Sequence, residues 1–555
     1  MTAPAYDAIV VGTGAGGAAV AYQLAKAGVR TLALEKGPWR KVDDFKESGV
    51  FGPKFSGRGR GDELKYIESH YLMPRDEVRF LSYSEHGQKE PPFAFTDSGW
   101  MSQLVGGGTV HYGGASFRYE EVDFRMRSSF GERADYPGLD EEHRAALVDW
   151  PITLREMEPY YDLAEQLIGI AGAPASGLPP LRFNKAAKRI ADALERVGSE
   201  VRVLPTPMAI NSARHMGRKA CRNSGLCQEY ACRYEAKSDA RVTLLRAASE
   251  TGNLTIQPMT FVRKFYAKEG RVAAVECVVG TGDGARVEQL SAPVIVVACE
   301  AIESVRLLLA SGLGNPDVLG RYLMFHVTGG ARSLAPEPTT TWDTAPHTAY
   351  INAFYHHTAT GDRPFLKAGI LLPSSVGGPL QEGRKYWGKA AQIFFNEVYP
   401  FKMDLSYIGE GMPTRYNRVE LAEVKDRYEM RGTRISYRPH PFDLNAGAYA
   451  AARCKEILSA AGGLIEDTAP DHLRPFLFKE TTAKRLFHCT GGARFGEDPA
   501  TSVLDSECRV HGLENLFVAD GSFMPTGGGA NPTLTIQANA LRVGDIIAAR
   551  LQRTA

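Results

Sequence analysis

Short apolar runs alternate with glycine-rich turns and helix-like patterns along this chain. Residues 7–11 and 31–35 are apolar runs of the kind that form strands buried on both faces of a parallel sheet. Residues 18–27 between them have a helical pattern, and the same strand-then-helix order returns at 294–299 and 301–310. The pattern predicts an α/β fold whose parallel sheet is assembled from segments distant in the sequence.

Other patterns occupy the middle and the end of the chain. Residues 40–98 are polar, glycine-bearing and irregular, which favours a lid or a subunit contact. The runs 368–372 and 392–395 are strand-like and predict parts of a second sheet. A last helical pattern reaches Leu551.

The turn after the first apolar run carries the residues of a dinucleotide site. Gly12 permits a tight turn, Gly14 lets the backbone approach a pyrophosphate, and Gly17 allows close packing of helix on strand. The start of the helix offers N–H groups to the phosphates. Glu35 ends the second strand, where a carboxylate accepts hydrogen bonds from the ribose hydroxyls and repels a 2′-phosphate. The unit predicts a dinucleotide other than NADP, without separating NAD from FAD.

Composition narrows the class of protein. The 555 residues exceed what one core holds, so two domains are expected. A net charge of +1 gives no reason to expect nucleic acid or an anionic membrane as a partner. No apolar run reaches the length of about 18 residues that a membrane span needs, and no secretion signal is present. We therefore expect a cytoplasmic protein.

Two further segments are candidates for a ligand site. Residues 104–114 interleave glycine with Val, Leu and Tyr, which indicates backbone lying against a flat ligand. A C-terminal block combines residues 487–496, 515–522 and 525–536 with the final helix. A plain NAD dehydrogenase is disfavoured, because NAD folds need neither of these segments.

Taken together, these segments resemble the glucose–methanol–choline (GMC) oxidoreductase family of FAD enzymes. The resemblance covers nearly the whole chain and extends to residues 150–161, 301–306 and 320–326. The branch it points to holds sugar dehydrogenases together with bacterial pyranose and glycoside oxidases. It implies a discontinuous Rossmann-like FAD-binding domain and a second, substrate domain built on a mixed or antiparallel sheet.

The resemblance orders the chain into seven segments. They are an FAD-binding segment at 1–40, a lid or subunit-contact segment at 41–98, an FAD-binding loop at 99–130, linker helices of the substrate domain at 131–200, a second FAD-binding segment at 201–330, the substrate domain at 331–480, and a C-terminal FAD and catalytic segment at 481–555.

The resemblance also implies roles for single residues. Oxidation of an alcohol needs a base for the hydroxyl proton, and histidine suits this role because its ordinary pKa is about 6.5. His488 matches the family's base, and Asn531 matches the partner whose amide holds the substrate oxygen. Asn531 followed by Pro532 is also a good start for a helix, and both roles hold together. The residues expected to bind FAD are Gly12, Gly14, Gly17, Glu35, Gly106, Gly107, Thr109, His111, Tyr112, Gly114, Val262, Asp520, Gly521, Pro532 and Thr533.

Two questions of chemistry stay open. His111 matches a position at which some relatives bond covalently to the flavin, although noncovalent FAD is the favoured interpretation. Cys221, Cys227 and Cys232 are closely spaced, but a [4Fe–4S] cluster normally needs four thiolates, and Ser224 stands where some relatives have a further cysteine. We expect no iron–sulfur cluster and no other metal. Four histidines are expected to be structural: His326, His356, His357 and His440.

The expected function is FAD-dependent oxidation of a hydroxyl group of a sugar, glycoside or polyol to a carbonyl. One alternative is oxidation of a non-sugar alcohol, such as a sterol or an aromatic carbinol. Another is a flavoprotein subunit that works only with a partner protein, or has lost catalysis. Oxygen or another electron acceptor completes the reaction, and a homo-oligomer is left open.

Overall fold

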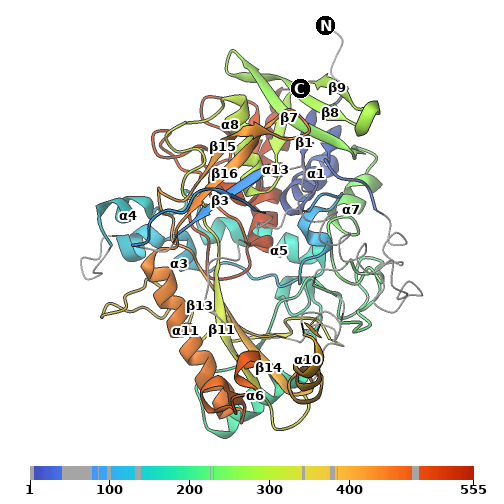
Figure 1. The fold of residues 1–555 in the computed structure, drawn as a ribbon. Coiled ribbons are helices and arrows are strands. Elements are labelled where there is room, and N and C mark those ends of the chain that lie inside the picture. The colour runs from blue at the N-terminus through green and yellow to red at the C-terminus, as the bar shows by residue number, and fades with distance from the viewer. Residues whose placement is uncertain are drawn as a thin grey trace.

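The structure is a computed structural model of the chain (Figure 1). It describes residues 5–40, 78–84, 87–96, 102–131, 139–225, 227–228, 231–339, 344–374, 382–383, 386–477 and 487–554. Among these residues, no helix has both the length and the apolar character that a membrane crossing demands.

A five-stranded parallel sheet occupies the upper part of Figure 1. Its strands, in spatial order, are β18 (Leu516–Val518), β10 (Val294–Val297), β1 (Ala8–Val11), β2 (Thr31–Leu34) and β6 (Leu254–Gln257). Every neighbouring pair runs parallel, and all strands except the edge strand β6 are fully buried. The predicted parallel sheet of distant segments is therefore confirmed.

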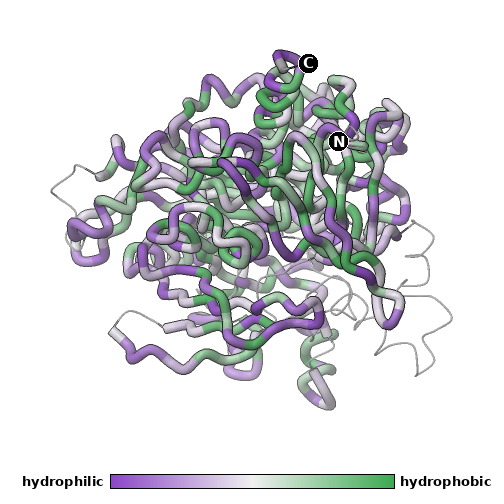
Figure 2. The backbone as a smooth tube through the Cα atoms, turned by 90° about the horizontal axis from the view of Figure 1, so that it is seen from above, coloured by the Kyte–Doolittle hydropathy of each residue, from purple (hydrophilic) through white to green (hydrophobic). Residues whose placement is uncertain are grey.

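Helices pack tightly against this sheet. Helix α1 (Ala15–Lys26) lies against both α13 (Thr533–Thr554) and α7 (Leu244–Glu250), and residues 16–25 of α1 are all buried. The many Gly and Ala residues of α1 permit this close approach, because they add almost no side-chain bulk. Helix α8 (Ala301–Ser311) follows β10, as the sequence predicts. Figure 2 shows that hydrophobic stretches gather in the interior and hydrophilic ones follow the outer loops.

Two antiparallel or mixed sheets flank the parallel one. Strands β7 (Thr260–Lys268), β8 (Arg271–Val279) and β9 (Arg286–Leu290) form an antiparallel sheet between β6 and β10 in the sequence. Strands β15 (Arg418–Lys425), β16 (Arg431–Tyr437), β3 (Arg79–Tyr83) and β4 (Ala94–Phe95) form a mixed sheet. The expectation of irregular structure at 40–98 is thus wrong for β3 and β4, which pair as strands. Residues 41–77 lie outside the described residues.

A second large sheet occupies the lower part of Figure 1. Strands β13 (Gly369–Ser374), β14 (Lys402–Gly409), β11 (Val327–Leu334) and β17 (Leu464–Ile465) lie in this order, and every neighbouring pair is antiparallel. The 20-residue helix α11 (Pro441–Ala460) packs across β11 and β14. The predicted second sheet is confirmed, and β13 matches the strand-like run 368–372.

One predicted strand is wrong. Residues 392–395 belong to helix α10 (Gly388–Ile393) and the π-helical turn Phe394–Val398 that follows it. Phe394 packs in a small aromatic cluster with Tyr386, Tyr399 and Phe476. A short run of apolar and aromatic residues fits a strand and a buried helix equally well, and here tertiary packing selects the helix.

Candidate active site

The turn between β1 and α1 is packed so closely that only glycine fits. Gly12 has a φ of +97°, and a Cβ atom on it would lie 2.3 Å from the carbonyl oxygen of Ala298. A Cβ atom on Gly17 would lie 2.0 Å from the carbonyl oxygen of Gly12. Among the described residues no side chain caps α1 at Gly14, which leaves the first N–H groups of the helix for an anionic ligand.

Glu35 follows β2 and joins this turn to the next segment. Its Oε2 accepts hydrogen bonds from the backbone N–H (3.1 Å) and the hydroxyl (2.6 Å) of Thr13, and its Oε1 accepts the N–H of Gly37 at 3.0 Å. Burial raises the pKa of the Glu35 carboxyl. Thr13 Oγ1 in turn accepts the N–H of Gly106 at 3.2 Å. The acid predicted to bind ribose therefore lies within one hydrogen-bonded unit with both glycine-rich segments.

The two glycine-rich segments touch directly. Gly106 and Gly107 both have positive φ, of +97° and +54°. A Cβ atom on Gly107 would lie 2.8 Å from the Cα atom of Gly14. Bare backbone from both segments therefore forms one continuous surface at this point.

The rest of the second segment is anchored to residues 238–240. Thr109 Oγ1 donates to the Gly106 carbonyl at 2.6 Å and accepts the N–H of Ala240 at 2.9 Å. The hydroxyl of Tyr112 donates to the carbonyl of Ser238 at 2.9 Å. These bonds hold the segment against residues 238–240.

His111 and Gly114 lie in the same segment. Burial, with a smaller effect from the charge of Lys237, lowers the pKa of His111 to about 4, so its imidazole is neutral at pH 7. Gly114 has a φ of +89° and accepts the N–H of Ala209 on its carbonyl at 2.7 Å.

The C-terminal block meets the start of α1. A Cβ atom on Gly16 would lie 1.7 Å from the carbonyl oxygen of Ala519, so residues 519–521 run against the helix. Asp520 is buried and accepts hydrogen bonds from the hydroxyl of Ser304 and from the N–H (3.0 Å) and hydroxyl (2.6 Å) of Ser522. Burial raises the pKa of Asp520.

Three other predicted residues lie at element boundaries near this block or near Glu35. Pro532 and Thr533 stand at the start of α13, where the carbonyl of Pro532 accepts the N–H of Ile536 at 3.0 Å. Val262 is buried on β7, whose first residue, Thr260, donates its N–H to the Glu35 carbonyl at 2.8 Å. Every residue predicted to bind FAD thus falls around the ends of β1, β2, β10 and β18 or in the segments that contact them.

This arrangement fits a dinucleotide cofactor. A Cβ atom on Gly107 would fill the space between this segment and Gly14. The carboxyl ends of β1 and β2 lead directly into the turn at Gly12 and into Glu35, and open α/β sheets bind such ligands at the carboxyl ends of their strands.

His488 and Asn531 lie side by side at the start of α13. His488 Nε2 is 3.2 Å from Asn531 Nδ2, although 43 residues separate them in the sequence. His488 has a φ of +56°, an unfavourable conformation for a side chain of this size that is characteristic of functional sites. Asn531 Oδ1 is buried and has no hydrogen-bond partner among the described residues.

A third residue, His326, completes this group. Its Nδ1 lies 3.0 Å from Nδ1 of His488, and its Nε2 lies 3.2 Å from the carbonyl oxygen of Gly527. Met324 and Thr490 exchange two backbone hydrogen bonds of 2.8 and 3.1 Å, so the strands carrying the two histidines are tied together two residues away from each ring.

Burial favours the neutral form of both rings. Burial is the main cause that lowers the pKa of His488 well below its ordinary value, with smaller effects from His326 and His347. Burial likewise lowers the pKa of His326 to about 4. An unprotonated His488 is the form that a general base requires.

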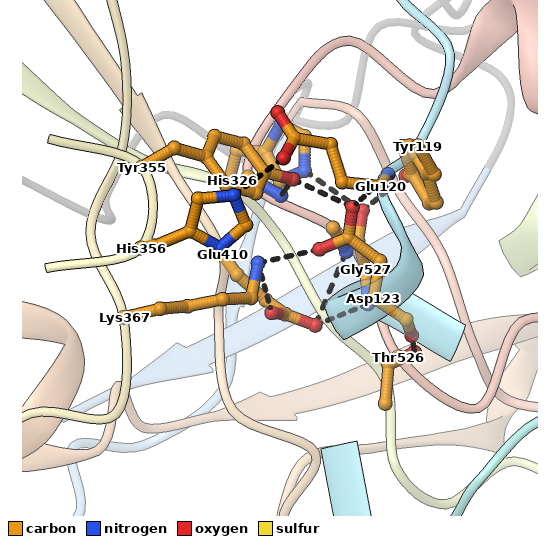
Figure 3. A network of polar contacts seen from close by, with 12 residues as sticks. Tyr119, Glu120, Asp123, His326, Tyr355, His356, Lys367, Glu410, Thr526 and Gly527 are labelled. Atoms are coloured by element: carbon orange, nitrogen blue, oxygen red, sulfur yellow. Dashed lines mark hydrogen bonds and ion pairs between the residues drawn. The ribbon is translucent and has the colours of Figure 1, made fainter. Parts of the chain in front are cut away.

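A buried network of charges lies near His326 (Figure 3). Lys367 Nζ is 2.7 Å from Asp123 Oδ1 and 2.8 Å from Glu410 Oε2, and all three groups are buried. The two carboxylates raise the pKa of Lys367 despite its burial. Glu410 Oε1 accepts the N–H groups of Gly527 (2.7 Å) and Gly528 (3.1 Å).

The segment 526–529, here called the glycine loop, is fixed by further side chains. The hydroxyl of Thr526 donates to the carbonyl of Asp123 at 2.8 Å, and Trp150 Nε1 donates to that hydroxyl at 2.6 Å. The N–H of Gly529 donates to the hydroxyl of Tyr355 at 2.9 Å. The hydroxyl of Tyr119 donates to the Gly527 carbonyl. Asn531 therefore follows a loop that the network holds rigidly.

The family resemblance singled out His488 and Asn531, whereas His326 was expected to be structural and Lys367, Glu410 and Asp123 were not singled out. The sequence does contain a signal for two of these residues, Lys367 and Glu410. Lys367 is a lone charge in an apolar run, Phe365-Leu-Lys-Ala-Gly-Ile-Leu-Leu372, and Glu410 stands between two glycines after another such run. Lone charges in apolar surroundings are rarely buried without a partner.

The other three histidines that were expected to be structural make ordinary contacts. His440 caps α11 by accepting the N–H of Phe442, His357 stacks on Tyr449, and His356 Nε2 lies 2.5 Å from a Glu120 carboxylate oxygen. All eight cysteines are free thiols. In the part of the chain that the structure covers, no three His, Cys, Asp or Glu side chains are grouped to hold a metal ion.

Comparisons with known proteins agree with this geometry. Two family signatures described as GMC oxidoreductase match residues 155–328 and 413–540. The chain is 32% identical over 568 residues to 6'''-hydroxyparomomycin C oxidase of Streptomyces lividus, covering 98% of this chain and 92% of that protein. It is 32% identical over 566 residues to paromamine 6'-oxidase of Streptomyces fradiae, with the same shares covered.

Among solved structures, pyridoxine 4-oxidase from Mesorbium loti is similar with a TM-score of 0.62. The match covers 98% of this chain and 99% of that one at 19% sequence identity, so it bears on the fold alone. It agrees with the division into a Rossmann-like sheet and a second sheet.

Proposed function

Because the chain belongs to the glucose–methanol–choline oxidoreductase family, we propose that it oxidises a hydroxyl group of a sugar or glycoside, or of a related polyol, to a carbonyl, with His488 as the general base. Family membership makes it an FAD-dependent oxidoreductase that acts on CH–OH donors. Both named relatives are oxidases, one of 6'''-hydroxyparomomycin C and one of paromamine, which supports a glycoside as the substrate.

The observation that carries the proposal is the pairing of His488 Nε2 with the amide of Asn531 at 3.2 Å. A substrate hydroxyl that enters between them donates its proton to Nε2 and accepts an N–H from Asn531 Nδ2. The amide then holds the oxygen as negative charge develops on it, and it does not titrate. General bases placed in this way contribute about 10²–10⁴-fold to a rate.

The cofactor supplies the other half of the reaction. Bound FAD would supply the acceptor for the hydride of the carbinol carbon, and His488 would take the hydroxyl proton. The residues proposed to hold it are the glycine segments around Gly14 and Gly107, with Glu35 at the ribose. Noncovalent binding is proposed, and His111 is the residue at which a covalent bond would form.

The N-terminus of α13 supports the same assignment. Asn531 and Pro532 precede a 22-residue helix, whose positive end lies at the site. Negative charge that develops on a ligand there is stabilised by the helix dipole by about 0.3–1 kcal/mol. Thr533 offers its backbone N–H at this end because the first N–H groups of a helix have no partner within it.

The test is an anaerobic visible spectrum of the purified protein before and after addition of sugars, glycosides, polyols, sterols and aromatic carbinols. We expect a yellow protein whose flavin band is bleached by the sugar or glycoside class. In His488→Ala we expect a protein that is still yellow and is bleached about 10²–10⁴-fold more slowly. His472→Ala is the matched control, because His472 is half-exposed and lies beside Glu397 on the surface.

Other outcomes select among the alternatives. Bleaching by sterols or aromatic carbinols alone would move the substrate class to non-sugar alcohols. A yellow protein that no compound bleaches would favour a subunit that needs a partner protein. An unchanged rate in His488→Ala would remove the assignment of the base.

A further inference from the structure

We propose that His326 is a positioning residue that fixes the tautomer of His488, so that Nε2 of His488 is the nitrogen without a proton. The inference rests on the proposed role of His488 for its functional meaning, but the tautomer itself can be measured independently of that role. The observation that carries it is a chain of hydrogen bonds from the Gly527 carbonyl through both imidazole rings to Asn531.

The direction of these hydrogen bonds is defined, because the series begins at the carbonyl of Gly527, which can only accept a hydrogen bond. The carbonyl oxygen of Gly527 lies 3.2 Å from Nε2 of His326, so this nitrogen must carry the hydrogen. A neutral imidazole carries one N–H, which leaves Nδ1 of His326 as an acceptor.

The position of the proton on His488 follows from that on His326. Nδ1 of His488 lies 3.0 Å from the acceptor Nδ1 of His326, so His488 must donate from Nδ1. Its Nε2 is then the lone-pair nitrogen, and it accepts the N–H of Asn531 Nδ2 at 3.2 Å. The bare nitrogen therefore faces the place proposed for the substrate hydroxyl.

The opposite tautomer would disable the site. If His326 were protonated, both of its nitrogens would donate, and Nδ1 of His488 would have to accept. The proton of His488 would then sit on Nε2, facing Asn531. The burial that keeps His326 neutral prevents this, with Lys367 adding to the effect and the Gly527 carbonyl and Asp123 opposing it. The titratable groups that act on His488 are His326 and His347.

The glycine loop keeps the accepting carbonyl in place. Glu410 Oε1 holds the N–H groups of Gly527 and Gly528, and Tyr355 holds that of Gly529. Lys367 balances the charge of Glu410 and Asp123 (Figure 3). Turning the Gly527 carbonyl away from His326 would also turn the N–H of Gly528, which lies in the same peptide, away from Glu410 and break that hydrogen bond.

The test compares the wild-type holoenzyme with His326→Asn and His326→Leu. The amide oxygen of Asn can accept a hydrogen bond near the place of Nδ1, whereas Leu has similar bulk and no acceptor. The primary readout is 15N NMR of histidine-labelled holoenzyme, with the His488 signals assigned from their loss in His488→Ala. We expect His488 to carry its proton on Nδ1 in the wild type and in His326→Asn, and to populate both tautomers in His326→Leu.

The second readout is the rate of anaerobic flavin bleaching by the substrate identified from the panel. We expect His326→Leu to lower this rate by about 10–10³-fold, as removal of an orienting partner does for other histidine bases, and His326→Asn to recover most of it. Equal flavin content and far-ultraviolet circular dichroism in all three proteins show that the difference does not come from misfolding.

The outcomes separate the two proposals. A proton on Nε2 of His488 in the wild type overturns the inference without any variant, as does an unchanged tautomer in a folded His326→Leu. If the tautomer changes as expected while His488→Ala keeps the wild-type rate, the inference about His326 stands and the proposed role of His488 as base falls.

Discussion

The proposed cofactor surface and the proposed catalytic corner around His488 are held together by different forces. The surface around Gly12, Gly17 and Gly107 is built from backbone that approaches backbone, with a Cβ atom excluded at each contact. The corner around His488 is built from side chains, and three buried charges hold its loop. The first region therefore depends on the absence of side chains, and the second depends on the pairing of particular ones.

The difference shows which substitutions each region tolerates least. A single methyl group is enough to disturb the glycine contacts, because tightly packed backbone cannot move aside without shifting a strand or helix. The catalytic corner is vulnerable instead to the loss of one charge, because the remaining charges stay buried. Three predictions test this contrast.

The largest effect is expected for Lys367→Met. The substitution leaves Asp123 and Glu410 buried close together without a counter-ion, which typically costs about 3–5 kcal/mol. We expect a correspondingly lower free energy of unfolding in urea denaturation followed by circular dichroism. Lys188→Met is the control, because Lys188 pairs with Asp192 on the exposed face of α6 (Lys185–Arg196) and should cost less than about 0.5 kcal/mol. Similar losses in the two variants would contradict a structural role for the buried charges.

A smaller effect on stability, but a clear loss of cofactor, is expected for Gly17→Ala. The added Cβ atom meets the Gly12 carbonyl oxygen at 2.0 Å, and such overpacking costs about 1–3 kcal/mol. The turn must shift, so we expect the ratio of flavin to protein absorbance to fall sharply in the purified protein. Gly28→Ala should keep its flavin, because a Cβ atom there has nothing within 4 Å and only the φ of +84° opposes it. Full flavin content in Gly17→Ala would show that the turn is less constrained than its contacts indicate.

The smallest effect is expected from pH. A general base works when unprotonated, so kcat/KM is retained above its pKa and lost as pH falls through it. Burial holds the pKa of His488 well below 6.5, so we expect kcat/KM to change by less than about twofold between pH 8 and 6.5. A profile that has already lost half its value at pH 6.5 would mean that the ring is solvated in the working enzyme.

The same contrast explains what the sequence could predict. The β1–α1–β2 unit is local, and its glycines and terminal acid stand at spacings that physics constrains, so the parallel sheet and Glu35 could be placed in advance. His488 and Asn531 were found only because the C-terminal block resembles a known family. His326, Lys367, Glu410 and Asp123 come from four separate segments, and nothing local in any one of them shows which others it meets. The run 392–395 was wrongly predicted as a strand because it is too short to show a periodicity that distinguishes a strand from a helix.

The strand order β18–β10–β1–β2–β6 has a consequence for folding of the chain during its synthesis on the ribosome. The strand that emerges early, β1, needs β10 as its neighbour, and β10 needs β18, which begins just over 500 residues after β1. At translation speeds of about 5–20 residues per second, β1 and α1 wait on the order of half a minute to more than a minute for β18 and α13. During that time the part of α1 that packs against α13 has no native cover, and it is available to chaperones. A nascent chain halted before β18 cannot assemble either the cofactor surface or the catalytic pair, so no truncated product should carry out the redox chemistry on its own.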